Sequence, residues 1–360
     1  MKKLDRYIVG KFLGTFFFTV LLLCVVIVVI DLSERVDDFL ENNAPMNLII
    51  FQYYANFIPH TVLTLSPLFI FVSVIFFTSR MAYRTEIIAI LASGISFYRI
   101  LFGPYFFAAT LLVILQLFAS HYWVPDANKD RLDFEYQYMR GQIVNRDKNI
   151  HLQIAPDSYV YLETFLLSDS SGRKFTLEQI DSNQNMVYKL HANRAKWNGT
   201  KEKWELTNYN ERHIDGLKET ITKGQKMDTT LNFHPRDFAR EKRFKDAMTR
   251  TELNEYIVKE RQRGTPNLEF YEVEKHRRTA VPFSTYILSI IALAVASRKV
   301  RGGMGFHVFI GIALSAGYIV ALQFSTTFAT NGNLSPLLGA WIPNLIFGVI
   351  AAWLLIKAPK

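Results

Sequence analysis

The fold is decided by residues 302–356, whose sequence is GGMGFHVFIGIALSAGYIVALQFSTTFATNGNLSPLLGAWIPNLIFGVIAAWLLI. These 55 residues include no Asp, Glu, Lys or Arg. The polar segment Ala329–Asn333 divides them into two apolar runs, about Phe306–Phe328 and Leu334–Ile356. A bilayer core is ~30 Å thick and needs ~20 apolar helical residues, so each run predicts a transmembrane helix.

Four more uncharged runs precede this stretch, namely Phe12–Ile30, Asn42–Ser79 (most apolar over about Phe57–Phe77), Ile100–Ser120 and Thr279–Ser297. A soluble protein does not bury six such runs as core helices, so the chain is predicted to cross a membrane six times. Basic residues precede the first run, as in a cleaved signal peptide. The run is longer than the apolar part of a signal peptide and no small-x-small site ends it, which predicts a retained helix.

The distribution of charge predicts the orientation. The 360 residues carry 41 Lys and Arg against 32 Asp and Glu, a net charge of +9. The N-terminal segment, the second and fourth loops and the C-terminal tail together hold 12 basic and 2 acidic residues, whereas the first loop holds five acids and a single base, Arg35. Basic loops stay on the cytoplasmic side, so both termini are predicted to be cytoplasmic. The basic excess therefore indicates topology, with no concentrated patch for nucleic acid.

Residues 122–278 predict a large polar domain outside the cytoplasm. The segments Asn149–Ile154 and Tyr159–Leu166 predict a hairpin, Asn198–Gly199 predicts a turn, and Met227–Phe233 alternates apolar and polar residues. Several short strands at this spacing are typical of a β sandwich or barrel. A capping box, Thr249–Glu252, predicts the start of a helix that Gly264–Pro266 would end.

The predicted fold class is an α-helical polytopic membrane protein, with three transmembrane helices on each side of an inserted extracytoplasmic all-β domain. The predicted boundaries are helices 1–3 in residues 1–121, the β domain in 122–248, a helical connector in 249–278 and helices 4–6 in 279–360.

Motifs for chemistry are absent from the sequence. It contains no Gly-x-x-x-x-Gly-Lys-Ser/Thr loop, no Gly-x-Ser-x-Gly elbow and no His-Glu-x-x-His pair. We therefore expect no catalytic residues, no metal site and no cofactor in this chain. Ion coupling is disfavoured because no acidic residue lies within a predicted span, and His60 and His307 lie near the ends of theirs, where both can reach the membrane interface. Cys24 is the single cysteine, so an intrachain disulfide is excluded.

The second cytoplasmic loop is the most informative one. Residues 81–92 are predicted to form a short helix along the membrane surface, with Gly94 as its stop. Glu86 is one of two acids on the cytoplasmic side. Two interpretations stay open: an interfacial helix in which Glu86 pairs with Arg84 or Arg80, or a docking helix for a soluble partner in which Glu86 determines the contact.

The whole chain, in order, resembles the LptF/LptG permease family (also called YjgP/YjgQ). Four local segments carry the resemblance, Leu4–Ile8, Arg84–Gly94, Glu274–Pro282 and Asn331–Asn344. The resemblance implies a β-jellyroll domain in the periplasm and a permease subunit of an ABC transporter in the bacterial inner membrane. Such a permease extracts lipopolysaccharide from the periplasmic leaflet and passes it to a periplasmic bridge toward the outer membrane.

The resemblance also implies partners and site residues. The partners are an LptB-like ATPase dimer that binds the ATP, a second LptF/LptG-type permease and an LptC-like single-span protein. The residues implied at the ATPase contact are Glu86, Arg84, Arg80, Ile87 and Leu91. The first and fifth helices would form a lateral gate, whose candidate substrate residues are Asp31, Glu34, Arg35, Phe324 and Phe328.

One departure from the family concerns the outer end of the first helix. Family members often place a basic residue there to meet lipid phosphates, whereas this sequence has Asp31, with Glu34 and Arg35 nearby. A divalent cation or basic residues of the partner permease would then make the phosphate contact. Normal transport by an Asp31→Ala, Glu34→Ala double variant would argue against a need for these acids.

Two alternative functions stay open from the sequence. One is a permease for another lipid or for a lipoprotein. The other is a membrane scaffold that transports nothing and binds a partner through its β domain. Binding of an ATPase whose hydrolysis rate responds to this chain would separate the permeases from the scaffold.

Overall fold

The structure is a computed structural model. It describes residues 3–139, 148–155, 157–166, 169–181, 185–199, 201–231, 244–262, 268–297, 303–332 and 334–358. The basic residues of the predicted fourth loop and the predicted helix stop Gly264–Pro266 lie outside them. Two compact units are present, a helical unit (residues 1–139, 245–253 and 269–360) and a unit built around a β-sheet (residues 140–244 and 254–268).

The helical unit confirms the six predicted membrane spans. The segments long and apolar enough to cross a bilayer are Lys3–Glu41, Ser66–Tyr83, Phe97–Glu135, Glu269–Ala296, Gly305–Asn331 and Pro336–Ile356. The corresponding main helices are α1 (Lys3–Glu41), α4 (Ser66–Tyr83), α7 (Phe106–Phe118), α12 (Glu269–Ala296), α13 (Gly303–Asn331) and α14 (Pro336–Ile356).

Around α4 and α7 the helices are interrupted. Before α4 lie α2 (Met46–Leu48), the π-helical turn η1 (Ile49–Tyr54) and α3 (Ala55–Thr64). The break between α3 and α4 falls at Leu65, because Pro67 lacks an N–H and disfavours helical backbone before it. The third span is a succession of α6 (Phe97–Ile100), η2 (Leu101–Tyr105), α7, η3 (Ala119–Trp123) and α8 (Val124–Tyr138).

Two boundaries of the sequence-based plan differ from the structure. The sequence predicts that the β domain begins at residue 122, but α8 continues the third span as a helix to Tyr138. Within the described part of the predicted connector, 249–278, lie α11 (Arg250–Gln262) and the first part of α12. A polar helix that extends a span beyond the bilayer has no hydropathy signal. A domain boundary predicted from the first charged residues therefore precedes the true end of the helix.

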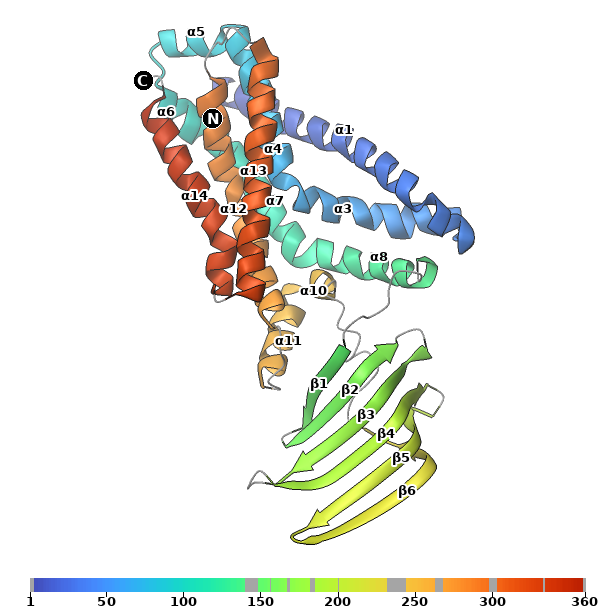
Figure 1. The fold of residues 1–360 in the computed structure, drawn as a ribbon. Coiled ribbons are helices and arrows are strands. Elements are labelled where there is room, and N and C mark those ends of the chain that lie inside the picture. The colour runs from blue at the N-terminus through green and yellow to red at the C-terminus, as the bar shows by residue number, and fades with distance from the viewer. Residues whose placement is uncertain are drawn as a thin grey trace. The chain divides into compact units, whose positions relative to one another are not determined.

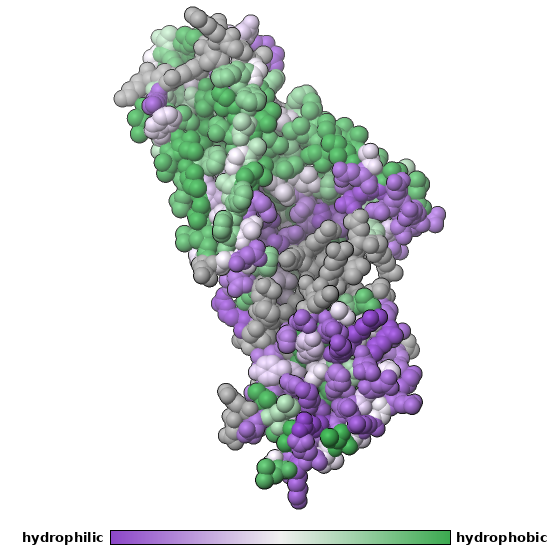
Figure 2. Space-filling view, viewed as in Figure 1, coloured by the Kyte–Doolittle hydropathy of each residue, from purple (hydrophilic) through white to green (hydrophobic). Residues whose placement is uncertain are grey.

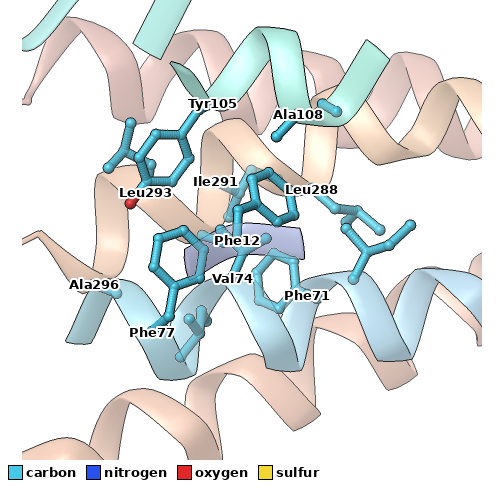
Figure 3. Close-up of a cluster of buried hydrophobic side chains, with 14 of the residues drawn as sticks. Phe12, Phe71, Val74, Phe77, Tyr105, Ala108, Leu288, Ile291, Leu293 and Ala296 are labelled. Atoms are coloured by element: carbon cyan, nitrogen blue, oxygen red, sulfur yellow. The ribbon is translucent and has the colours of Figure 1, made fainter. Parts of the chain in front are cut away.

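The core of the helical unit is centred on α4 and α12. Helix α4 packs against α1, α12 and α13, and α12 packs in addition against α7 and α14. Figure 3 shows the side chains of Phe12, Phe71, Phe77, Tyr105 and Leu288 meeting in this core. Both chain termini, α5 (Glu86–Ala92) and α6 lie at one end of the unit (Figure 1).

The outer part of α1 leaves this core and packs elsewhere. It runs beside α3, and α8 lies on the other side of α3, as Figure 1 shows. An aromatic cluster joins these elements, in which the ring of Phe39 lies 5.6 Å from Tyr53 and 6.0 Å from Phe134. The two halves of α1 therefore belong to different packing environments.

Among its described residues, the second unit contains an antiparallel sheet of six strands in the order β1-β2-β3-β4-β5-β6. The strands are β1 (Lys148–Ala155), β2 (Ser158–Leu166), β3 (Ser171–Ile180), β4 (Met186–Asn198), β5 (Lys203–Asp215) and β6 (Lys218–Thr229). The predicted hairpin is confirmed as β1–β2, and Asn198 pairs with Lys203 across the predicted turn. The all-β class is confirmed, and the described strands connect as a meander.

One face of the sheet holds its apolar core, which includes Trp204, Phe165, Phe175 and Leu206. On β5, Trp204 and Leu206 follow the period of two expected of a strand with one buried face. In the space-filling view, hydrophobic residues cover the helical unit and hydrophilic residues dominate the sheet unit (Figure 2). This contrast is expected for a bilayer-embedded part and a water-exposed part.

After the sheet, the chain forms α10 (Phe244–Ala247) and α11. The predicted capping box is confirmed: the backbone N–H of Thr249 donates to Glu252 Oε2 (2.8 Å), and that of Glu252 donates to Thr249 Oγ1 (3.4 Å). Burial alone would raise the pKa of Glu252, but the Thr249 N–H makes the largest contribution and lowers it.

Candidate functional site

The loop after α4 contains a short helix that is separate from α4. The predicted helix 81–92 is wrong in its first half, because Met81–Tyr83 end α4 and α5 covers Glu86–Ala92. Thr85 breaks the helix with a left-handed backbone (φ 61°), an unfavourable conformation for a β-branched residue that local propensity does not predict. The predicted stop is confirmed, since Gly94 has φ 84°, which glycine adopts without strain.

One face of α5 anchors it to the helical unit. Ile87 is buried in the core and Leu91 packs against that core. These residues are four apart and share a helix face. The predicted contact residues Ile87 and Leu91 thus face the helices, and they position α5 while remaining covered.

The remaining residues of this loop are accessible. Arg80 and Arg84 are exposed, and Glu86 is half-buried. Glu86 accepts a hydrogen bond from the Tyr7 hydroxyl, with 3.0 Å between Tyr7 Oη and Glu86 Oε2. No ion pair between Glu86 and an arginine is found among the described residues. Tyr7 and the exposed Ile88 also belong to this surface. The sequence does not indicate their part in it, because their spacing matches no recognised motif.

At the outer part of α1, Asp31 is buried and internally bonded. Its carboxylate accepts a hydrogen bond from the Tyr53 hydroxyl (3.0 Å) and pairs with Arg35 Nε (3.2 Å). Arg35 Nη1 also lies 3.5 Å from Met139 Sδ. Glu34 is exposed. The structure therefore joins Asp31 and Arg35 in one cluster and leaves Glu34 outside it.

The two phenylalanines predicted for the gate are on α13, and both are exposed in the single chain. Among the described residues, no hydrogen bond, ion pair or ring contact joins Phe324 or Phe328 to the Asp31 cluster. The predicted gate residues thus form two separate groups, one on each of two exposed helices.

A buried charge cluster lies at the start of α12, and sequence reasoning missed its role. Glu274 is paired with Arg278 Nε (2.9 Å) and Arg277 Nη2 (2.8 Å). Arg278 donates further to the backbone carbonyls of Lys245 and Met248 (2.6 Å each). The cluster holds the segment that returns from the sheet unit against α12. The sequence shows Glu274–Arg278 with the i, i+4 spacing of an ion pair, but burial is not visible there.

A cavity of about 60 Å³ adjoins this cluster. Three of its lining residues, Ser66, Gln116 and Asn128, are buried and each has one side-chain oxygen without a hydrogen-bond partner. A cavity of this size has room for a few ordered waters, and these three oxygens could accept hydrogen bonds from them. Asp246 lies at the edge of the cavity. Its burial raises its pKa most, and the nearby Glu274 carboxylate raises the pKa further.

The two histidines expected near the interface differ. His60 Nδ1 lies 3.1 Å from Asn128 Nδ2 and borders the cavity. His307 is buried, with Nδ1 2.7 Å from Ser79 Oγ, near the start of α13 and the end of α4. No group of three or more potential metal ligands occurs within the described ranges.

Comparison with known proteins gives one family. The family model described as "Lipopolysaccharide export system permease LptF/LptG" matches residues 6–357. The chain is 21% identical over 357 residues to the lipopolysaccharide export system permease protein LptG of Haemophilus influenzae, with 98% of both chains covered. It is 20% identical over 304 residues to LptG of Escherichia coli K12, with 83% of both covered.

Proposed function

Since the chain belongs to the lipopolysaccharide export permease family LptF/LptG, we propose that it is the membrane half of an ATP-driven machine whose ATPase is a separate chain. It is a multi-pass inner-membrane transporter and not an enzyme. The proposed partners are an LptB-like ATPase dimer, a second permease of this family and an LptC-like single-span protein. ATP binds to the ATPase, and no cofactor is assigned to this chain.

The proposed reaction is the extraction of lipopolysaccharide from the periplasmic leaflet and its transfer to a periplasmic bridge. Both termini and α5 then lie in the cytoplasm, and the sheet unit lies in the periplasm. The location of the termini and α5 at one end of the helical unit supports this orientation (Figure 1).

The accessible surface around Glu86 carries the proposal for the ATPase contact. Helix α5 is fixed from beneath by Ile87 and Leu91, while Glu86, Arg84 and Arg80 stay reachable. A short helix that is anchored on one side and charged on the other suits the transfer of force from a soluble subunit. Glu86 is proposed to make the central polar contact, with the arginines beside it.

The exposed faces of α1 and α13 support the proposed gate. Both carry large apolar side chains with no cover in the single chain, among them Phe17, Phe18, Phe324 and Phe328. Lipid acyl chains and helices of the second permease would both cover such surfaces. Since Asp31 is bonded to Tyr53 and Arg35, its proposed role is to hold Arg35 in place.

The test is co-purification with the ATPase from membranes that contain all proposed subunits. We expect Glu86→Arg to abolish retention of the ATPase and the stimulation of its hydrolysis. The matched control is Glu41→Arg, which reverses an exposed acid at the end of α1 and should leave both unchanged. An intact, active complex with Glu86→Arg would reject the ATPase contact, and mass spectrometry of the bound lipid tests the substrate.

A further inference from the structure

The start of α1 contains a segment, Leu4–Ile8, for which the proposed function gives no role. Two of its side chains, Asp5 and Ile8, are buried, although Asp5 is charged. A buried carboxylate is costly unless it is paired. The contacts of Asp5 therefore indicate what this segment does.

Asp5 is paired across the helical unit with Arg99. Arg99 Nη2 lies 2.8 Å from Asp5 Oδ2, and the two residues are 94 positions apart. Arg99 belongs to α6, whose first turn is capped by Ser96 Oγ, the acceptor of the Arg99 N–H (3.3 Å). The pair thus joins the first turn of α1 to the segment that follows α5.

A glycine gives Arg99 the space to reach Asp5. Gly103 lies in η2, and a Cβ atom built there would overlap the Arg99 guanidinium. Any side chain at 103 would therefore force the guanidinium to move from its present position. The geometry of the Asp5–Arg99 pair as it stands thus requires a glycine at 103 as well as the two charges.

The same turns of α1 make a second contact, at the other end of the segment 86–99. Tyr7 donates its hydroxyl proton to Glu86, the first residue of α5, while Asp5 binds Arg99 just after it. The start of α1 therefore contacts both ends of the segment that contains α5. A displacement of α5 would therefore act on α1 through two contacts.

The rest of α1 can carry such a displacement outward. Phe12 is fully buried and its ring lies 5.5 Å from Phe77 and 5.9 Å from Tyr105, as Figure 3 shows. Beyond Phe16, α1 continues as one helix with mostly exposed side chains to Ile30. A motion at its start is thus transmitted along a continuous helix to the lipid-facing part.

We propose that the Asp5–Arg99 pair, seated on Gly103, fixes α1 to the α5–α6 segment so that movement of α5 moves the gate helix. Asp5 and Arg99 are positioning residues in this role, and the inference rests on the proposed function. The ATPase contact itself does not involve them, so loss of the pair uncouples hydrolysis from transport without releasing the ATPase.

The experiment uses the complete transporter reconstituted in vesicles with lipopolysaccharide, and it measures lipid released per ATP hydrolysed. Asp5→Asn and Gly103→Ala break the pair in two different ways. The first removes one charge and the second displaces the guanidinium, while alanine stabilises a helix relative to glycine. Arg6→Gln, an exposed neighbour on the same turn, is the control.

We expect both variants to retain the ATPase and its hydrolysis rate, and to lower lipid released per ATP by about fivefold or more. The exchanged pair Asp5→Arg, Arg99→Asp should restore part of the ratio, and a lowered ratio at an unchanged hydrolysis rate is the result that a merely structural role would not predict. A wild-type ratio in both single variants, or no recovery in the exchanged pair, would overturn this inference alone. A wild-type chain that neither binds the ATPase nor exports lipid would overturn the proposed function as well.

Discussion

Helices α4 and α12 differ from α1 and α13 in what surrounds them, although all four are membrane spans. In the most apolar window of each span, 72% of the residues of α4 and 61% of those of α12 are buried within the chain. The corresponding shares are 11% for α1 and 22% for α13. The first two helices form the scaffold, and the other two present their surfaces to lipid or to another chain.

The comparison also shows what hydropathy measures in a membrane protein. Helix α1 has the most apolar window of the six spans and α4 the least, so the most apolar helix is the least buried. In α4, Ser73 and Thr78 are fully buried and hydrogen-bonded, the former to its own helix and the latter to Tyr105. Lipid-facing positions must be apolar, whereas an interior position tolerates a polar group that has a partner.

The largest predicted effect is on the charge cluster of α12. Glu274→Ala would leave Arg278 buried without its carboxylate, which we expect to destabilise the helical unit by about 3–5 kcal/mol. The measurement is thermal unfolding of the purified chain in detergent, together with its yield. Glu34→Ala, which removes an exposed acid from α1, should leave both unchanged. Equal stability of the two variants would contradict the distinction between scaffold and gate helices.

The second prediction compares two phenylalanines. Phe71→Ala on α4 removes a fully buried ring, and we expect a loss of about 3 kcal/mol, at the lower end of the usual range because no transfer from water accompanies helix packing in lipid. Phe324→Ala on α13 removes an exposed ring and should change stability by less than about 0.5 kcal/mol.

The transport assay completes this comparison. If α13 forms part of the gate, Phe324→Ala lowers lipid export although the chain is as stable as the wild type. A loss of stability with Phe324→Ala that matches that of Phe71→Ala would place α13 in the scaffold instead.

Much of this architecture was predictable because it depends on the local composition of the sequence. Uncharged runs marked all six spans, and the Thr249–Glu252 box and the first β-hairpin were located within a residue or two. What the sequence did not predict depends on partners distant in the chain. The left-handed Thr85 goes against the backbone preference of a β-branched residue, and the burial of His307 against Ser79 follows from packing between helices, which no local pattern encodes.

The candidate site was predictable to a similar degree. The resemblance indicated the right loop, and Glu86 is accessible within it. It did not separate Ile87 and Leu91, which face the core, from the accessible residues. It named Asp31 as a candidate gate residue and gave no sign of the bond from Tyr53, which lies 22 positions away in the π-helical turn η1.

The third prediction concerns the point at which α13 joins the scaffold. The Tyr318 hydroxyl donates to Asn344 Oδ1 on α14 (2.8 Å), and Asn344 Nδ2 donates to the Ala280 carbonyl on α12 (2.7 Å). Tyr318→Phe should cost about 1 kcal/mol, because it leaves a buried amide oxygen unpaired. The control is Thr327→Val on the same helix, whose hydroxyl bonds only its own helix backbone and is exposed. An equal effect of both substitutions on thermal unfolding would show that this hydrogen bond adds nothing to the packing that holds α13.

The smallest predicted effect extends the contrast between buried and exposed charge to the sheet unit. Asp169 accepts a hydrogen bond from Ser171 Oγ (2.8 Å) and pairs with Arg194 (2.6 Å). Burial alone would raise the pKa of Asp169, but these two partners outweigh it and lower the pKa. The contribution of Asp169 to stability is therefore present above its unfolded pKa of about 4 and is lost as the pH falls further.

Because Asp169 and Arg194 are more than a third exposed, solvent screening limits this contribution to about 0.5 kcal/mol. Hydrogen exchange of β3 amides, corrected for intrinsic rates, measures it between pH 6 and pH 3. Wild-type protection should fall toward that of Asp169→Asn on acidification, while Arg194→Gln should resemble the Asn variant at pH 6 and change less with acid. A difference between wild type and Asp169→Asn that persists at pH 3 would mean that the Asn side chain disturbs packing. The effect would then come from steric change and not from the charge, and the sheet would not share the electrostatic dependence predicted for α12.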